Sequence, residues 1–178
     1  MGAPLSKGAL ALPAESVGVF GRHRDPCDDP RNAEVIAFLR RHLTLAEQLW
    51  PRFVPELRAV RDVTMGELRT HPDLVGELID LAPSRKDAWM LMGAPVLIAP
   101  SGVMYATAFS MHELMVRCGD VADPRLLAPA SREEPVGPGW HALNVWLSGV
   151  PRPDRPAARR NLMQLVARAR STAAKLRS

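Results

Sequence analysis

The chain has 178 residues, 47% of them hydrophobic, which is enough for one globular domain with a buried core. Its net charge of +4 is unevenly placed, because residues 151–178 carry eight Arg or Lys and a single Asp. The two cysteines, Cys27 and Cys118, are far apart in sequence, which excludes a disulfide framework and a Cys-x-x-Cys zinc site.

The N-terminal region has no regular hydrophobic pattern. Residues 1–30 mix Gly, Pro, Ala and charged residues, so we expect a disordered arm. The apolar run at 9–12 ends at Pro13 before a signal peptide could form. Arginine supplies 20 of the 23 basic residues, which indicates a GC-rich coding sequence. We therefore expect a cytoplasmic protein of bacterial origin.

Helices are predicted in the first half of the chain. The first covers 31–49, after an Asp-Asp-Pro start that suits a helix N-terminus, and shorter helical pieces follow it. Asp73 is expected to cap a second helix. The apolar stripe of that helix consists of Leu74, Leu78 and Leu81. Ser84 is expected to cap a further helical segment that includes Ala88–Leu91.

The uncharged run 88–111 is long enough for a membrane span to be weighed. Pro95 and Pro100 would break such a helix twice. A buried β-hairpin with strands over 95–99 and 103–109 is therefore the better account, and no membrane association is expected.

Two more strands are predicted after the hairpin. Leu114, Val116 and Cys118 alternate with more polar residues, which is the pattern of a strand with one buried face. The proline-rich segment 120–139 is a connection, and 140–147 is a fourth strand. Both faces of that strand are apolar, so we expect the last helix to cover one face and the N-terminal helices the other.

The last helix begins near Asp154 and Pro156. Its apolar stripe consists of Leu162, Leu165, Val166, Ala169, Ala173 and Leu176. Three basic residues, Arg160, Arg168 and Lys175, are predicted to point away from this stripe. The fold class is therefore α+β, with a four-stranded antiparallel sheet, N-terminal helices and a C-terminal helix packed on the sheet.

This order of elements resembles the N-terminal domain of the TfoX competence regulators. The segments that carry the resemblance are Met92–Ile98, Gly102–Ala106, Glu113–Gly119, Gly139–Leu147 and the closing helix Ala157–Leu176. YjbR-like proteins and small luciferase-annotated domains are the alternatives. The expected organisation is a disordered arm over 1–30, a helical extension over 31–70 and a TfoX N-terminal-like domain over 71–178.

The resemblance implies a regulatory or protein-interaction module without catalytic residues or cofactors, and a protein partner. The residues themselves show no catalytic motif. None of the five histidines has the spacing of a metal site. Cys118 falls on the apolar phase of its strand, so it is expected to be a buried small hydrophobe and not a nucleophile.

Two binding sites are considered. Tyr105, Trp140 and Trp146 would line an aromatic groove for a small molecule, or for an enzyme's substrate, if they are not buried in the core. Arg160, Arg168 and Lys175 would form a basic patch that binds nucleic acid weakly and without sequence specificity. The alternative for the patch is a solvated helix face.

Overall fold

The computed structural model describes residues 26–41, 70–110, 112–119, 132–133, 136–147 and 150–176. Residues 1–25 of the arm expected over 1–30, the second half of the helix expected at 31–49, and the remainder of the helical extension up to residue 69 lie outside this part of the chain.

The centre of the fold is an antiparallel sheet with the strand order β1-β2-β3-β4-β6-β5. Its strands are β1 (Ala88–Leu91), β2 (Ala94–Ile98), β3 (Met104–Phe109), β4 (Glu113–Arg117), β5 (Arg132–Glu133) and β6 (Trp140–Asn144). The predicted α+β class and all four predicted strands are confirmed. The predicted strand number was wrong, because β1 and β5 add to the four.

Strand β1 replaces a predicted helical segment. Ser84 accepts a hydrogen bond from the Lys86 backbone N–H, but the turn that it caps is only the 3₁₀ helix η3 (Arg85–Asp87). Met92 and Gly93, with φ of 50° and 74°, then join β1 to β2 as a two-residue hairpin turn. The pairing with β2 consequently fixes β1 as a strand, which its short apolar sequence could not reveal.

The uncharged run 88–111 therefore contains β1, β2 and β3, and the predicted β-hairpin is confirmed. Among the helices that the structure describes, none combines the length and the apolar character needed to cross a membrane.

The proline-rich connection predicted over 120–139 also contributes to the sheet, because Glu133 of β5 pairs with His141 of β6.

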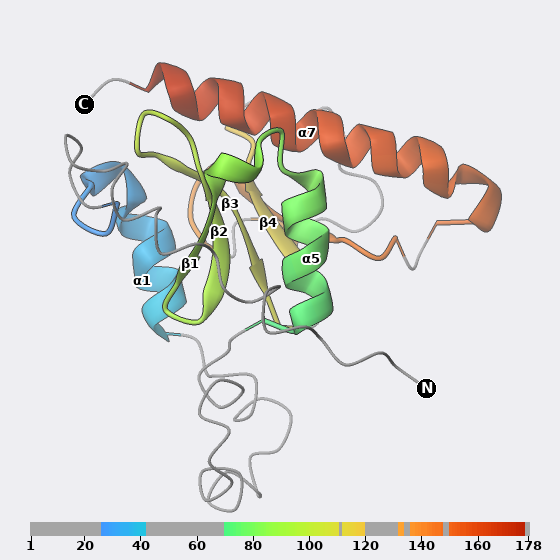
Figure 1. Cartoon of the computed structure of the whole chain (residues 1–178), viewed down its shortest axis with the longest axis horizontal. Coiled ribbons are helices and arrows are strands. Elements are labelled where there is room, and N and C mark those ends of the chain that lie inside the picture. Colours follow the sequence, from blue (N-terminus) through green and yellow to red (C-terminus); the bar gives the residue numbers. More distant parts are fainter. Residues whose placement is uncertain are drawn as a thin grey trace, which may run out of the picture.

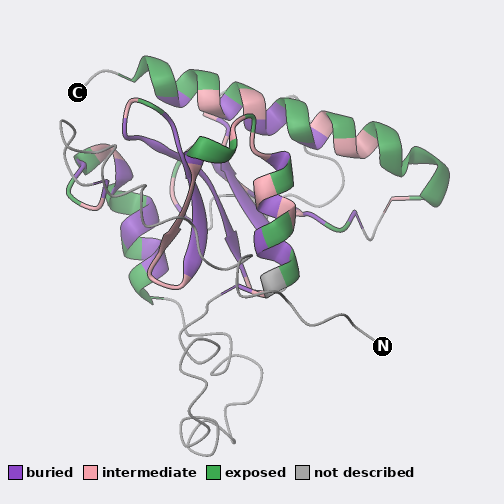
Figure 2. Cartoon of the chain, viewed as in Figure 1, coloured by how far each residue is buried: buried purple, intermediate pink, exposed green. Residues whose placement is uncertain are grey.

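Helices cover both faces of the sheet (Figure 1). On one face lie α5 (Pro72–Leu81) and α7 (Arg155–Lys175), which is preceded by the 3₁₀ helix η4 (Arg152–Asp154). Both predicted apolar stripes are buried there apart from Leu176, which is exposed. Figure 2 shows the opposite side of α7 exposed along its length.

The predicted cap of α5 was wrong. Asp73 lies inside the helix, and the His71 ring accepts a hydrogen bond from the backbone N–H of Asp73.

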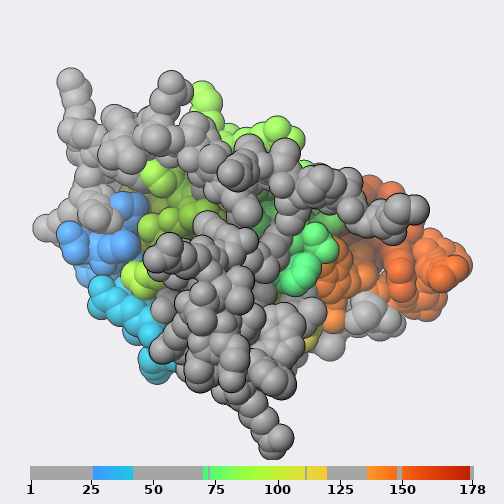
Figure 3. All heavy atoms as spheres, turned by 60° about the horizontal axis from the view of Figure 1, so that its bottom comes forward, coloured from blue at the N-terminus to red at the C-terminus, as the bar shows by residue number. Residues whose placement is uncertain are grey.

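The other face is covered by α1 (Ala33–Arg41), which follows the 3₁₀ helix η2 (Pro30–Asn32). Val35, Phe38 and Leu39 of α1 are buried against the sheet, and the Phe38 ring meets Phe109 edge-on at 5.5 Å. In Figure 3, α1 and the first turns of α7 appear on opposite sides of the molecule. The predicted coverage of both faces is thus confirmed for α1 and α7, whereas α5 shares the face of α7.

Asn32 joins the segment before α1 to the sheet. Its side-chain amide donates to the carbonyls of Pro26 and Gly102 at 2.8 and 2.9 Å, and its Oδ1 accepts from the Met104 backbone N–H at 2.8 Å. Because α1 and this segment share the core of the sheet, the predicted boundary at residue 71 does not separate α1 from the domain. The fold begins at least as early as Pro26.

Candidate interaction site

The three aromatic candidates do not form a common groove. Tyr105 is fully buried on the sheet face beneath α5 and α7, whereas Trp140 is buried on the face beneath α1. The guanidinium of Arg117 lies 5.9 Å from the centre of the Trp140 ring. Trp146, which is 39% exposed, follows the end of β6. Tyr105 and Trp140 are therefore core residues, and the aromatic groove considered from the sequence is absent.

Tyr105 instead belongs to a polar network at the edge of the core. Its hydroxyl donates a 2.8 Å hydrogen bond to the buried carboxylate of Asp87, which also accepts from the Arg170 guanidinium. Burial and the Asp87 carboxylate raise the pKa of the Tyr105 hydroxyl, because both disfavour a phenolate. The network ties η3 and β3 to α7.

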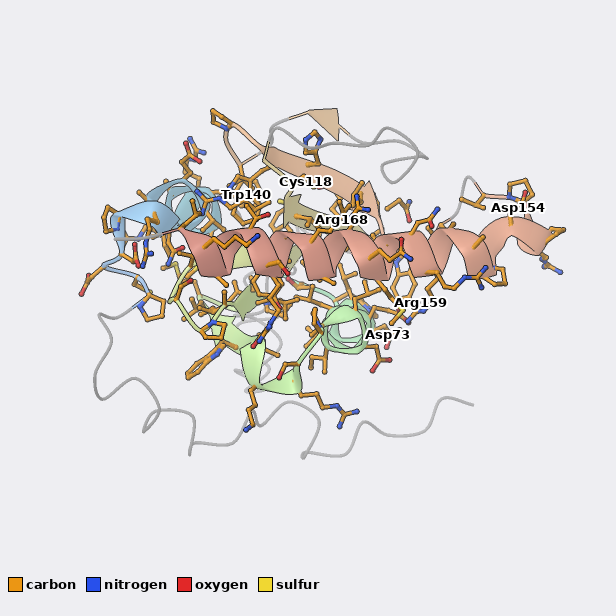
Figure 4. The ribbon with its side chains drawn as sticks, turned by 90° about the horizontal axis from the view of Figure 1, so that it is seen from above. Asp73, Cys118, Trp140, Asp154, Arg159 and Arg168 are labelled. Atoms are coloured by element: carbon orange, nitrogen blue, oxygen red, sulfur yellow. The ribbon has the colours of Figure 1, made fainter. Side chains whose placement is uncertain are left out.

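The basic residues of α7 divide into two groups. Arg159 forms an ion pair of 2.7 Å with Glu77 of α5, and Arg170 pairs with Asp87. Arg160, Arg168 and Lys175 are exposed and have no acidic partner among the described residues. Figure 4 shows Arg159 and Arg168 on opposite sides of the helix. The prediction that Arg160, Arg168 and Lys175 point away from the core is confirmed, and we call these three residues the basic face.

A groove of about 440 Å³ runs beside the basic face. Its floor contains Cys118, Leu165 and Ala169, which are buried. Burial raises the pKa of the Cys118 thiol to about 12, so the thiol is protonated at neutral pH and the floor is uncharged. The prediction that Cys118 is a buried small hydrophobe is confirmed.

The rim of this groove is polar and exposed. It is formed by Arg168, Ser171, Thr172 and Lys175 of α7. These positions are three, four and seven residues apart, so they share one side of the helix. Sequence reasoning found the two cations but missed the hydroxyl groups and the floor, because the approach of Cys118 to α7 depends on the tertiary packing.

The histidines of the described segments are separate from one another. His71 caps α5, His112 is exposed, and His141 on β6 has a buried Nδ1 without a hydrogen-bond partner. No three His, Cys, Asp or Glu side chains of the described segments converge on a point where they could hold a metal ion. His23 and His42 lie outside those segments.

No protein-family model, no curated protein and no solved structure matches this chain.

Proposed function

We propose that this protein is a non-catalytic regulatory or protein-interaction module of the bacterial cytoplasm, similar to the TfoX N-terminal domain, and that it binds an acidic partner protein through the basic face. The observation that carries the proposal is the division of charge along α7. Arg159 and Arg170 are neutralised by Glu77 and Asp87, whereas Arg160, Arg168 and Lys175 have no acidic partner in the part of the chain that the structure describes.

The basic face has no role in the packing of the domain. Its three side chains are exposed; Arg160 lies opposite the buried stripe of α7, and Arg168 and Lys175 lie beside that stripe. Acidic groups of a partner would supply the counter-charges that the described part of the chain does not. Such complementarity favours association with an acidic protein surface.

Nucleic acid is the second candidate for this surface, because three cations in a row could neutralise phosphates. Single strands are usually bound by aromatic rings that alternate with the cations, and the basic face contains none. Among the described residues, Trp146 is the one exposed large aromatic residue. We therefore expect DNA binding to be weak and driven by the phosphate backbone.

The proposal is tested by reversing the charge of the basic face with Arg160→Glu, Arg168→Glu and Lys175→Glu in one variant. The control variant reverses Arg85, Lys86 and Arg152, which are also exposed, and so changes the net charge equally. Both variants are compared with the unmodified protein by quantitative capture from host lysate and by circular dichroism.

We expect the basic-face variant to lose its captured partners while it keeps its fold, and the control to retain them. Equal capture by both variants would contradict the proposal. Fluorescence anisotropy with mixed duplex DNA forms the second part of the experiment. Tight binding of DNA that persists at physiological salt would make nucleic acid the partner instead.

A further inference from the structure

The described part of the groove beside the basic face combines an apolar floor with one cation toward each end, Arg168 and Lys175. We infer that it binds a short acidic segment of the partner protein, with one bulky apolar side chain on the floor and an acidic side chain at each end. This inference rests on the proposed function and specifies the kind of segment that the basic face recognises.

The floor selects for an apolar side chain. Leu165 and Ala169 contribute hydrocarbon, and the Cys118 thiol is neutral at physiological pH because its pKa lies far above 7. A polar group placed there would lose its contacts with water and find no charged partner among the described residues of the floor. The volume of about 440 Å³ is sufficient for a leucine-sized or phenylalanine-sized side chain.

The rim determines the charge and spacing of the segment. Arg168 and Lys175 are seven residues apart, which corresponds to about 10 Å along the helix axis. In an extended segment the side chains alternate between two faces, and residues four positions apart share one face at a separation of about 13 Å. Two acids four positions apart, with the apolar residue midway between them on the same face, would therefore reach both cations through the flexible side chains of Arg168 and Lys175. Ser171 and Thr172, which lie between the cations, have hydroxyl groups suited to hydrogen bonds with the segment's backbone.

The open shape of the groove favours a peptide over a small molecule. A drug-sized ligand is usually buried over about 70–90% of its surface. Here the rim residues Arg168, Ser171, Thr172 and Lys175 are exposed, so the described residues cover an occupant from one side. A peptide remains attached to its protein and gains affinity from contacts on either side of the groove.

The experiment selects ligands from a phage-displayed library of random short peptides on the immobilised full chain. We expect enriched sequences with two acidic residues four positions apart and a bulky apolar residue midway between them. Enriched peptides are then synthesised with a fluorescent label and titrated against three variants. Thr172→Trp fills the groove and leaves every charge in place, Ala174→Trp adds the same bulk at an exposed position of α7 outside the groove, and the basic-face variant removes the cations.

We expect Thr172→Trp to weaken binding about tenfold or more, because the apolar side chain loses its burial, and Ala174→Trp to change it less than about twofold. Acidic peptides without an apolar preference, together with unchanged affinity for Thr172→Trp, would overturn this inference and leave the basic face as a purely electrostatic site. If the selection enriched no acidic peptides and the basic-face variant bound as the unmodified protein does, the proposed function would be overturned as well.

Discussion

Gly139 lies so close to Gly119 that a Cβ added at position 139 would approach the Gly119 Cα to 3.1 Å. The carbonyl of Gly139 also accepts hydrogen bonds from the backbone N–H groups of Cys118 and Gly119. Gly139 has a φ of +78°, a conformation that L-residues rarely adopt. Its position at the start of β6 thus depends on the absence of a side chain.

We predict that Gly139→Ala lowers the free energy of unfolding by about 2 kcal/mol, because it adds both backbone strain and a close contact. Gly76→Ala is the matched control, since a Cβ on this exposed position of α5 would meet nothing within 4 Å. It should raise stability by about 0.5–1 kcal/mol. Urea denaturation measures both, and equal effects would contradict the structural assignment.

The hydrogen bond from Tyr105 to Asp87 gives a second prediction. Tyr105→Phe should cost about 1 kcal/mol, the usual value of one internal hydrogen bond. Asp87→Ala should cost about 3 kcal/mol or more, because it leaves both the Tyr105 hydroxyl and the Arg170 guanidinium without their acceptor. Denaturation curves of both variants test this order, and an Asp87→Ala protein as stable as Tyr105→Phe would contradict it.

The raised pKa of Tyr105 also predicts a dependence on pH. Folding favours the protonated hydroxyl, so its contribution to stability is complete below the ordinary pKa of about 10 and is lost as the pH rises above it. Tyr105 is the only tyrosine of the chain, so its ultraviolet absorbance reports ionisation directly. We expect phenolate to form only as the protein unfolds. Ionisation of Tyr105 in the folded protein near its ordinary pKa of about 10 would contradict the burial of its hydroxyl.

Cys118 gives a third prediction, best measured in a Cys27→Ser background where it is the single thiol. Its pKa of about 12 and its burial predict a slow reaction with Ellman's reagent at pH 7 and a fast one in denaturant. Stability from the protonated thiol is complete below the ordinary pKa of 9.0 and declines as the pH rises toward 12. Rapid labelling of the folded protein would show that Cys118 is accessible.

Asn32 provides a fourth prediction, which tests whether α1 belongs to the domain. Asn32→Ala removes three buried hydrogen bonds and should cost about 3 kcal/mol. Asn32→Asp should be no better, because a carboxylate cannot donate to the two carbonyls that its amide contacts. Asn161→Ala, at a half-buried position in α7, should change stability by less than about 0.5 kcal/mol. A fully stable Asn32→Ala protein would mean that the N-terminal segment docks independently of the sheet.

Much of the fold could be predicted because its elements have clear hydrophobic periods. The stripe of α5 at Leu74, Leu78 and Leu81 correctly indicated its one buried face. The single buried face predicted for β4 was wrong, because Met115 is buried beneath α1 while Leu114 and Val116 are buried beneath α5 and α7. Strand β1 was not predictable, because Ala88–Leu91 is too short to show a period. The apolar character of both faces of β6 correctly indicated that the sheet is covered twice.

The candidate site was less predictable, because it depends on contacts between residues far apart in sequence. Arg170 and Arg168 look alike in the sequence, yet among the described residues Arg170 meets an acid and Arg168 does not, and the acid that Arg170 meets lies 83 residues away. The floor of the groove likewise needs Cys118 to pack beside α7. No local pattern in the sequence contains this information.

Arg159 and Arg168 lie on opposite sides of α7, and the electrostatic potential therefore differs between these two sides of the helix. The side toward α5 is neutralised by Glu77, whereas no described acid neutralises the side of the basic face. A polyanion that diffuses toward the molecule is attracted to one long edge of the helix and is turned to lie along it before contact. The consequence is kinetic: removing cations from this edge should slow association and reduce its sensitivity to salt, whereas the dissociation rate should depend on what fills the groove.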